Sequence, residues 1–205
     1  MTIESERGAV LLRWKSLFSS GHSTGGAPLS DMLESYLIAA LIGKSDHAEV
    51  LDIGAGTGRT ARFILQSLRA RGWEGKLICT DALPFFIAPG AEFLLSDMFS
   101  PPFRNGTFDV IIARHVLEGY GIEAVHSFLY ECCRILRPGG LLMVEDILHH
   151  PLEVKNPSCM PNSMKAACVL QMSIIAMQLR KAVYRNVECG RVRYSAVFKC
   201  TSRSQ

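Results

Sequence analysis

The stretch Val50-Leu-Asp-Ile-Gly-Ala-Gly-Thr-Gly58 decides the fold, because an apolar run ends there in an acid and a glycine-rich turn. Gly54 permits a tight turn, and Gly56 and Gly58 remove side chains that would keep the backbone away from a ligand. The helix predicted to begin near Thr60 directs its first backbone N–H groups at the same space. This strand, turn and helix predict a parallel α/β fold with a ligand site at its first turn.

Strand and helix patterns alternate from Ala48 onward. Short apolar runs separated by helical periodicity predict a doubly wound, mainly parallel sheet of seven strands. Two short strands around Glu188-Cys-Gly-Arg191 are spaced as a hairpin and would add an antiparallel edge at the C-terminus. The other predicted strands cover Ala48–Ile53, Lys76–Thr80, Ala91–Leu95, Phe108–Ala113 and Leu141–Glu145, and the helices cover Thr60–Arg71, Ile122–Leu136 and Ser163–Ala182.

The 205 residues fit a single domain. Residues 1–45 would form N-terminal helices with a Gly- and Ser-rich loop, Ser19–Pro28, that suits either a lid or a simple connector. Residues 46–148 would form the ligand-binding core, and residues 149–205 a long helix and the terminal hairpin.

Composition excludes several classes of protein. Apolar residues make up 48% of the chain, but no run of 18 apolar residues is present, so no membrane span is predicted. The polar N-terminus is not followed by the apolar core of a signal peptide, which favours a cytoplasmic protein. The seven cysteines form no CxxC pair, which favours reduced thiols over disulfides and predicts no metal site.

Positive charge gathers at the C-terminal end. The segment from Arg180 to Gln205 contains seven basic residues and one acid, so its net charge is +6. Because the whole chain has a net charge of +3, the remaining residues carry −3. Such a segment is either a solvated face or a surface for an anionic partner such as RNA. An RNA affinity that falls with salt would favour the second interpretation. The sequence leaves the oligomeric state open.

Acidic side chains stand where the first three strands end. In this architecture ligands bind outside the carboxyl ends of the strands. Asp52, beside the glycine turn, suits a cationic or hydroxyl-bearing ligand better than a pyrophosphate, although it could instead hold backbone N–H groups of the turn. Asp81 can accept hydrogen bonds from a ribose diol or cap a helix. Asp97 can accept from an exocyclic amine or form a turn, with Met98 packing on a purine.

These segments resemble, in order, the motifs of the class I S-adenosylmethionine-dependent methyltransferases. Val50–Gly58 resembles motif I, Ile78–Asp81 the second strand with its ribose-binding acid, and Leu95–Met98 the third-strand motif at the adenine. Phe108–Leu117 with Leu136–Leu141 resembles the fourth strand and the turn into the fifth. The resemblance covers residues 48–148 and implies S-adenosylmethionine as cofactor, held by Asp52, Gly54, Ala55, Gly56, Gly58, Asp81, Ala82, Asp97, Met98 and Arg114.

The methyl acceptor is less well marked. His115 after the fourth strand and His149 and His150 after the fifth are candidates for a general base, although the last two could lie in a surface loop. Members of the resembled family that methylate an amine of DNA adenine or protein glutamine often carry an Asn-Pro-Pro-Tyr type of motif after the fourth strand, and this chain lacks it there. The predicted elements outside the core also include no separate module for binding a polymer. We therefore expect a small-molecule acceptor, with RNA methylation or a non-catalytic S-adenosylmethionine-binding partner subunit as alternatives. A nicotinamide-dependent enzyme is disfavoured because the turn lacks the GxGxxG register.

Overall fold

The computed structural model describes residues 8, 12, 47–85, 88–117, 120–147, 184–192 and 195–202. The predicted loop Ser19–Pro28 and the predicted helix Ser163–Ala182 lie outside these residues. The described helices are α3 (Arg59–Arg69) and α4 (Ile122–Ile135). The strands are β1 (Val50–Ile53), β2 (Leu77–Asp81), β3 (Glu92–Leu95), β4 (Phe108–Arg114), β5 (Leu136–Ile147), β6 (Tyr184–Val192) and β7 (Ser195–Ser202).

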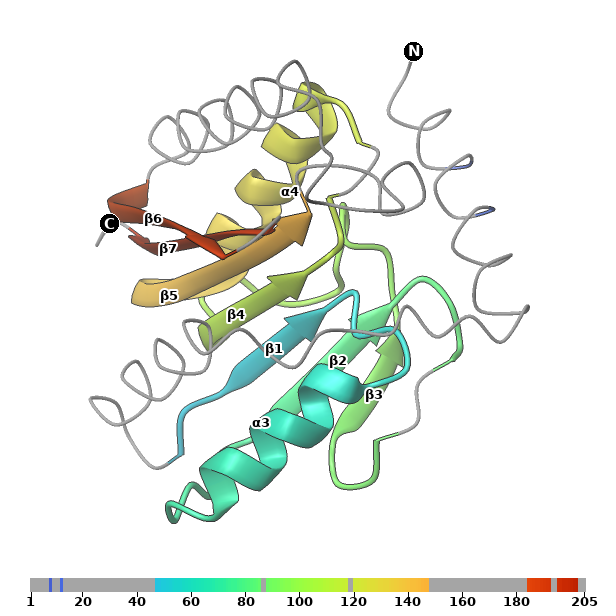
Figure 1. The fold of residues 1–205 in the computed structure, drawn as a ribbon, viewed down its shortest axis with the longest axis vertical. Helices are drawn as coiled ribbons and strands as arrows, with labels where there is room; N and C mark the ends of the chain where they lie inside the picture. Colours follow the sequence, from blue (N-terminus) through green and yellow to red (C-terminus); the bar gives the residue numbers. More distant parts are fainter. Residues whose placement is uncertain are drawn as a thin grey trace.

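The strands form one sheet in the order β3-β2-β1-β4-β5-β7-β6 (Figure 1). The first five strands in this order pair in parallel, so all of them end at the same edge of the sheet. The order reverses at β1, from which β2 and β3 extend to one side and β4 and β5 to the other. The predicted α/β fold with a parallel sheet is therefore confirmed, and its switch point lies between β1 and β4.

The two C-terminal strands differ from the sequence prediction in position. β7 pairs antiparallel with β5, and β6 pairs antiparallel with β7. The segment Glu188–Arg191, predicted to be the turn between short strands, lies inside β6, and the pairing of Val192 with Ser195 ends the ladder instead. Gly190 suggested a turn, but a glycine is also tolerated within a strand.

The start of β5 also differs from the prediction. The segment Arg137–Gly140 was predicted to be a turn, but it lies within β5, whose first residue, Leu136, pairs with Phe108. The register between β4 and β5 shifts after Phe108, and the regular pairing resumes at Leu141. The Pro-Gly-Gly segment is thus an irregularity inside a long strand.

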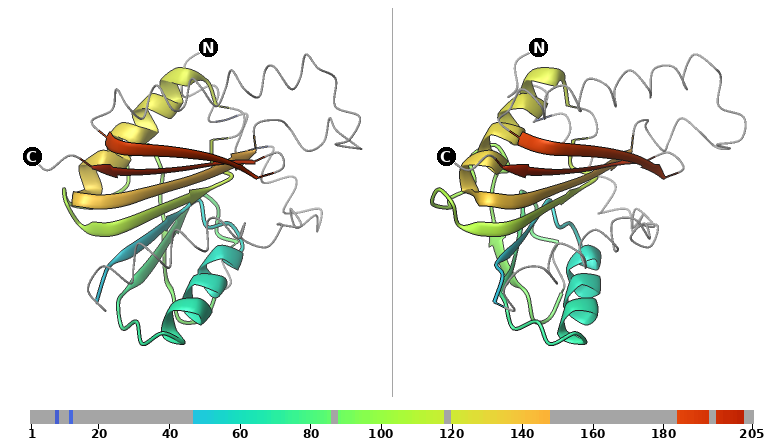
Figure 2. Two further views of the ribbon diagram at one scale, coloured as in Figure 1. Left: turned by 60° about the vertical axis from the view of Figure 1, so that its left-hand side comes forward. Right: turned by 90° about the vertical axis from the view of Figure 1, so that its left-hand side faces the viewer.

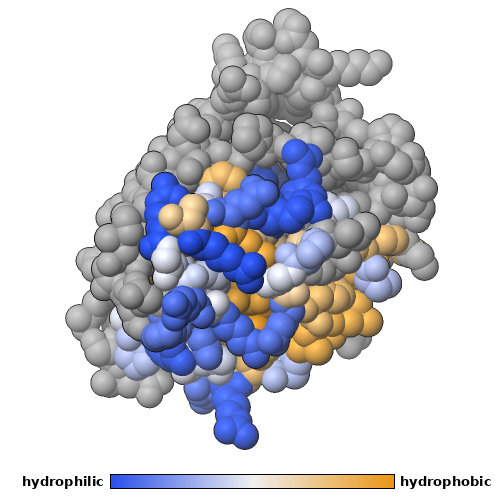
Figure 3. Space-filling view, turned by 90° about the horizontal axis from the view of Figure 1, so that it is seen from below, coloured by the Kyte–Doolittle hydropathy of each residue, from blue (hydrophilic) through white to orange (hydrophobic). Residues whose placement is uncertain are grey.

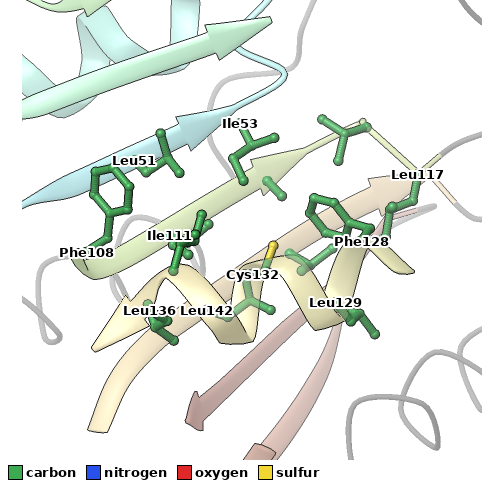
Figure 4. Packing of buried hydrophobic residues seen from close by; sticks show 14 of the residues in the cluster. Leu51, Ile53, Phe108, Ile111, Leu117, Phe128, Leu129, Cys132, Leu136 and Leu142 are labelled. Carbon is green, nitrogen blue, oxygen red and sulfur yellow. The ribbon is translucent and has the colours of Figure 1, made fainter. Parts of the chain in front are cut away.

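Helices cover both faces of the sheet, as the two views in Figure 2 show. One face packs against α4 through a cluster that includes Phe108, Ile111 and Phe128, all fully buried (Figure 4). The other face packs against α3 through Val50, Ile112 and further apolar residues. Because side chains alternate along a strand, these continuous apolar strands are buried on both sides, as the sequence predicted.

The remaining surface is mixed. Figure 3 shows hydrophilic residues over much of the described surface seen from below, with hydrophobic areas between and beside them. Leu94 and Leu95 on the edge strand β3 are among the exposed large hydrophobic residues, at 39% and 58%. Among the described residues, no helix is long and apolar enough to cross a bilayer.

Candidate functional site

The glycine turn between β1 and α3 has a backbone that only glycine adopts easily. Gly54 and Gly56 have φ angles of 70° and 54°, in the left-handed region. A Cβ atom on Gly54 would lie 2.1 Å from Cγ1 of Val116, so this glycine also lets the segment after β4 approach. The N–H groups of Gly54 and Ala55 donate to the Thr80 carbonyl oxygen at 2.8 and 2.9 Å, which ties the turn to β2.

Gly58 ends the turn and begins the helix. It has a φ angle of 78°, and α3 follows with no side-chain hydrogen bond at its N-cap and no acid in its first turn. The first N–H groups of a helix lack intrahelical acceptors and carry partial positive charge. The turn and helix end together therefore suit a ligand with a negatively charged or hydrogen-bond-accepting group.

Asp81, the last residue of β2, connects two loops. Its Oδ2 accepts from the Gly56 N–H and its Oδ1 accepts from the Leu83 N–H, both at 2.8 Å. Burial raises the pKa of Asp81, while backbone hydrogen bonds from Gly56, Leu83 and Ala82 oppose the increase. This carboxylate therefore fixes the position of the glycine turn relative to the loop that begins at Ala82.

Four ionisable side chains lie on the α3 face of the sheet at its carboxyl edge. Asp52 pairs in register with Cys79 and Ile112, which belong to the apolar cluster on that face. Side chains two positions apart on a strand point to the same face of the sheet. The residues two positions before Asp81, Arg114 and Glu145 belong to this same cluster, so these three side chains lie on the α3 face as well. Three acids and one base thus lie at the ends of adjacent strands.

Arg114 and Glu145 form a buried ion pair. Nε of Arg114 donates to Oε2 of Glu145 at 2.7 Å, and the two side chains are only 9% and 4% exposed. The two residues are also register partners on β4 and β5, and the His115 N–H donates to the Glu145 carbonyl oxygen at 2.8 Å. Glu145 therefore holds the end of β4 through both its side chain and its backbone.

Asp52 is buried, with 1% of its surface exposed, and its Oδ2 has no hydrogen-bond partner among the described residues. Burial raises the pKa of this carboxyl to about 7, the nearby Asp81 carboxylate raises it further, and Arg114 lowers it. Asp52 lies beside the turn, as predicted, but among the described residues it accepts no hydrogen bond from a backbone N–H of the turn, so its predicted alternative role of holding the turn is not supported.

His115 combines strain with an unsatisfied ring atom. Its φ angle is 57°, which is uncommon for a residue with a side chain, and its buried Nδ1 has no partner among the described residues. Burial lowers the pKa of His115 to about 4, and the Arg114 charge lowers it too, so the ring is neutral at pH 7. Two unsatisfied buried polar atoms, one on Asp52 and one on His115, therefore lie at the ends of β1 and β4.

The segment after β3 completes this edge. Oδ1 of Asp97 accepts from the Phe99 N–H at 3.1 Å, so this acid forms the turn that was one of its two predicted roles. Met98 and Phe99 are partly buried and pack against the cluster on the α4 face. The Phe99 ring lies 5.3 Å from that of Tyr120 in an edge-to-face arrangement, which joins the loops after β3 and β4.

The structure gathers most of the predicted site residues at one edge. The glycine turn, Asp81 and Arg114 meet beside Asp52, and Asp97 follows the neighbouring strand end. His149 and His150 lie outside the described residues. Sequence reasoning missed Glu145 as a site residue, although an acid at the end of an apolar strand, level with the Arg114 that ends the neighbouring strand, is a usable signal. No group of three or more potential metal ligands occurs among the described residues.

Part of the chain matches a known protein family. The profile of a family described as a methyltransferase domain matches residues 51–144, which include the turn and the ends of β1, β2, β4 and β5. The match covers 94 of the 205 residues, so residues 51–144 are similar to this methyltransferase domain family. The chain is similar along its whole length to the solved structure of a 1,6-didemethyltoxoflavin-N1-methyltransferase of Burkholderia thailandensis with bound 1,6-didemethyltoxoflavin and S-adenosylhomocysteine. The TM-score is 0.71 at 15% identity, with 100% of this chain and 92% of that chain covered.

The curated relatives of this chain are longer. A fatty-acid O-methyltransferase of Mycolicibacterium smegmatis is 29% identical over 132 residues, which are 59% of this chain and 47% of that protein. A hybrid PKS-NRPS synthetase of Emericella nidulans is 30% identical over 141 residues, which are 62% of this chain and 3% of that protein. The chain therefore spans less than half the length of these two relatives.

Proposed function

We propose that this chain transfers the methyl group of S-adenosylmethionine to a small-molecule acceptor. The observation that carries the proposal is the clustering of unsatisfied groups at the carboxyl edge of β1 and β4. Asp52 and His115 each bury a polar atom without a partner, beside a turn built for close approach of a ligand. Unsatisfied buried polar atoms are costly, and a bound ligand would remove that cost.

The residues at this edge fit the proposed cofactor. S-adenosylmethionine supplies an electrophilic methyl group on sulfur, so the protein needs mainly to position the reactants and exclude water. Asp81 retains lone pairs for the ribose hydroxyls beyond the backbone hydrogen bonds that it accepts. The glycine turn with Ala55 would allow the ligand to approach, and Ala82 would begin the loop on the ribose side. Asp97 and Met98 follow the end of β3 and would lie on the adenine side. Arg114 is held at the end of β4 by its ion pair with Glu145, and its proposed role is to help form the donor site.

The acceptor is proposed from what surrounds this core. The fatty-acid O-methyltransferase relative and the toxoflavin methyltransferase neighbour, as their names state, act on molecules that are not polymers. We propose that residues 46–148 bind the donor and that residues 1–45 and 149–205 shape the acceptor pocket. Because His115 is neutral at pH 7, its proposed role is a hydrogen bond to a ligand rather than that of a strong base. Free thiols at Cys79, Cys132 and Cys133 support a cytoplasmic location.

Donor binding tests the proposal directly. We expect S-adenosylmethionine and S-adenosylhomocysteine to bind with a Kd in the micromolar range or tighter, and NAD not to bind, because the carboxylates at this edge would repel a pyrophosphate. Isothermal titration calorimetry measures all three. Binding of NAD together with no response to either sulfur ligand would overturn the function. Methyl transfer to any acceptor would separate an enzyme from a non-catalytic subunit.

Replacing Asp81 by alanine is expected to weaken S-adenosylmethionine binding by about 1.5–3 kcal/mol. The substitution removes the ribose acceptor and also frees the Gly56 N–H and the Leu83 N–H. The matched control is Glu92→Ala, since Glu92 is an exposed acid at the start of β3 that forms an ion pair with Lys76. Calorimetry on both variants provides the test, and an unchanged Kd in Asp81→Ala would show that this carboxylate does not face the donor.

A further inference from the structure

Asp52 is an acidic residue that is buried with no direct partner for its charge among the described residues. It is 1% exposed, and its Oδ2 has no hydrogen-bond partner among the described residues. An ionised carboxylate without a partner is strongly disfavoured in such a place, so the group takes up a proton instead. With a pKa of about 7, Asp52 in the free protein is protonated in about half of the molecules near pH 7 and in most of them at lower pH.

The described residues around Asp52 compensate its charge only in part, because Arg114 lowers its pKa while burial and Asp81 raise it. On β2, Cys79 is its register partner and Asp81 adds negative charge. On β4, Arg114 is the nearby base, but its Nε is bound to Glu145 of β5. The buried residues of α3, which covers this face, are Thr60 and four apolar residues, so the helix offers no buried charge. His115 is neutral at pH 7.

Among the described residues, three acids and one base thus leave this edge short of positive charge. Charges in a buried site interact more strongly than in water, so a cationic ligand beside Asp52 would favour its ionised form. S-adenosylmethionine carries two cationic groups, a sulfonium and an ammonium, whereas S-adenosylhomocysteine keeps only the ammonium. Either group would provide the missing charge.

We propose that Asp52 exchanges its proton for the cationic part of the methyl donor, so that the carboxyl ionises and its proton leaves to solvent when the donor binds. This inference rests on the proposed function. It makes Asp52 a residue that determines specificity for a cationic ligand, because a neutral analogue of the same shape cannot draw the proton away. It also makes donor affinity depend on pH, with the ionised form present at higher pH.

The direction of the pH effect follows from linkage. With a pKa of about 7 in the free protein, Asp52 must lose its proton on binding at pH 6 but is mostly ionised at pH 8. The Kd of S-adenosylmethionine should therefore rise by up to about tenfold when the pH falls from 7.5 to 6. At pH 6.5, about half a proton to one proton should be released for each donor molecule bound.

Calorimetry in buffers of different ionisation enthalpy counts the released protons. It is applied at pH 6.5 to the unmodified chain, to Asp52→Asn and to Glu92→Gln, an identical carboxyl-to-amide change at an exposed position. We expect release from the unmodified chain and from Glu92→Gln, and its loss together with a flat Kd between pH 6 and 7.5 in Asp52→Asn. Release with both sulfur ligands would place the ammonium at Asp52, and release with S-adenosylmethionine alone would place the sulfonium there.

Two results would overturn the inference while leaving the proposed function intact. One is donor binding to the unmodified chain with no proton release. The other is the same release from Asp52→Asn, which would mean that another group titrates. A purely structural role for Asp52 predicts that the variant binds more weakly at every pH with the proton count unchanged. Failure of either sulfur ligand to bind at all would instead contradict the proposed function.

Discussion

Replacing Gly56 by valine is expected to abolish donor binding, with the Kd of S-adenosylmethionine raised by more than about 100-fold. Gly56 has a φ angle of 54°, a region that β-branched residues almost never occupy. Its N–H also donates to Asp81 at 2.8 Å, so a change in its backbone would displace the carboxylate proposed to bind the ribose. The added side chain would in addition fill space at the turn where a ligand approaches the backbone. Calorimetry measures the loss.

Gly72→Val is the matched control for backbone strain. Gly72 has a φ angle of 80° in the turn after α3, and a Cβ atom there would meet nothing within 4 Å. Both valines should destabilise the fold by about 1–3 kcal/mol, but only the one at position 56 should affect the donor. Gly56→Ala provides a milder variant that remains folded. Normal donor binding by folded Gly56 variants would show that the turn is not the donor site.

The ends of the parallel strands could be predicted from the sequence because burial and turn chemistry agree there. The predicted strand Phe108–Ala113 differs from β4 by one residue at its end, and the strand predicted to end at Ile53 is β1. Continuous apolar runs have few alternatives to a strand buried on both faces. Since parallel strands end at one edge, correctly predicted strand ends also place Asp52, Asp81 and Arg114 close together.

Pairings between side chains could not be predicted in the same way. That Asp81 binds two backbone N–H groups, and that Glu145 pairs with Arg114, depends on register and rotamers rather than on composition. Local signals also misled at the C-terminus, where Gly190 suggested a turn inside β6. A glycine indicates conformational freedom, but the surrounding strand pairing decides whether that freedom is used.

Replacing Arg114 by leucine is expected to lower the free energy of unfolding by about 3–5 kcal/mol. The variant leaves Glu145, whose side chain is 4% exposed, without its partner in the interior. The backbone hydrogen bond from His115 to Glu145 remains, so the loss should come from the uncompensated charge rather than from a displaced strand. Urea denaturation followed by circular dichroism measures the change. A loss below about 1 kcal/mol would mean that water reaches Glu145.

The double variant Arg114→Leu with Glu145→Leu separates stability from function. Removing both charges should recover most of the lost stability, because apolar pairs often replace buried ion pairs at little net change. The pH dependence of donor binding should stay different from that of the unmodified chain, since Arg114 also lowers the pKa of Asp52 and is absent from the double variant. Without that charge the Asp52 carboxyl holds its proton to a higher pH, and the rise in Kd should begin above pH 7 instead of near it. If the pair served stability alone, the double variant would show the pH profile of the unmodified chain. A shifted profile in a fully stable protein would place the ion pair in the electrostatics of the donor site.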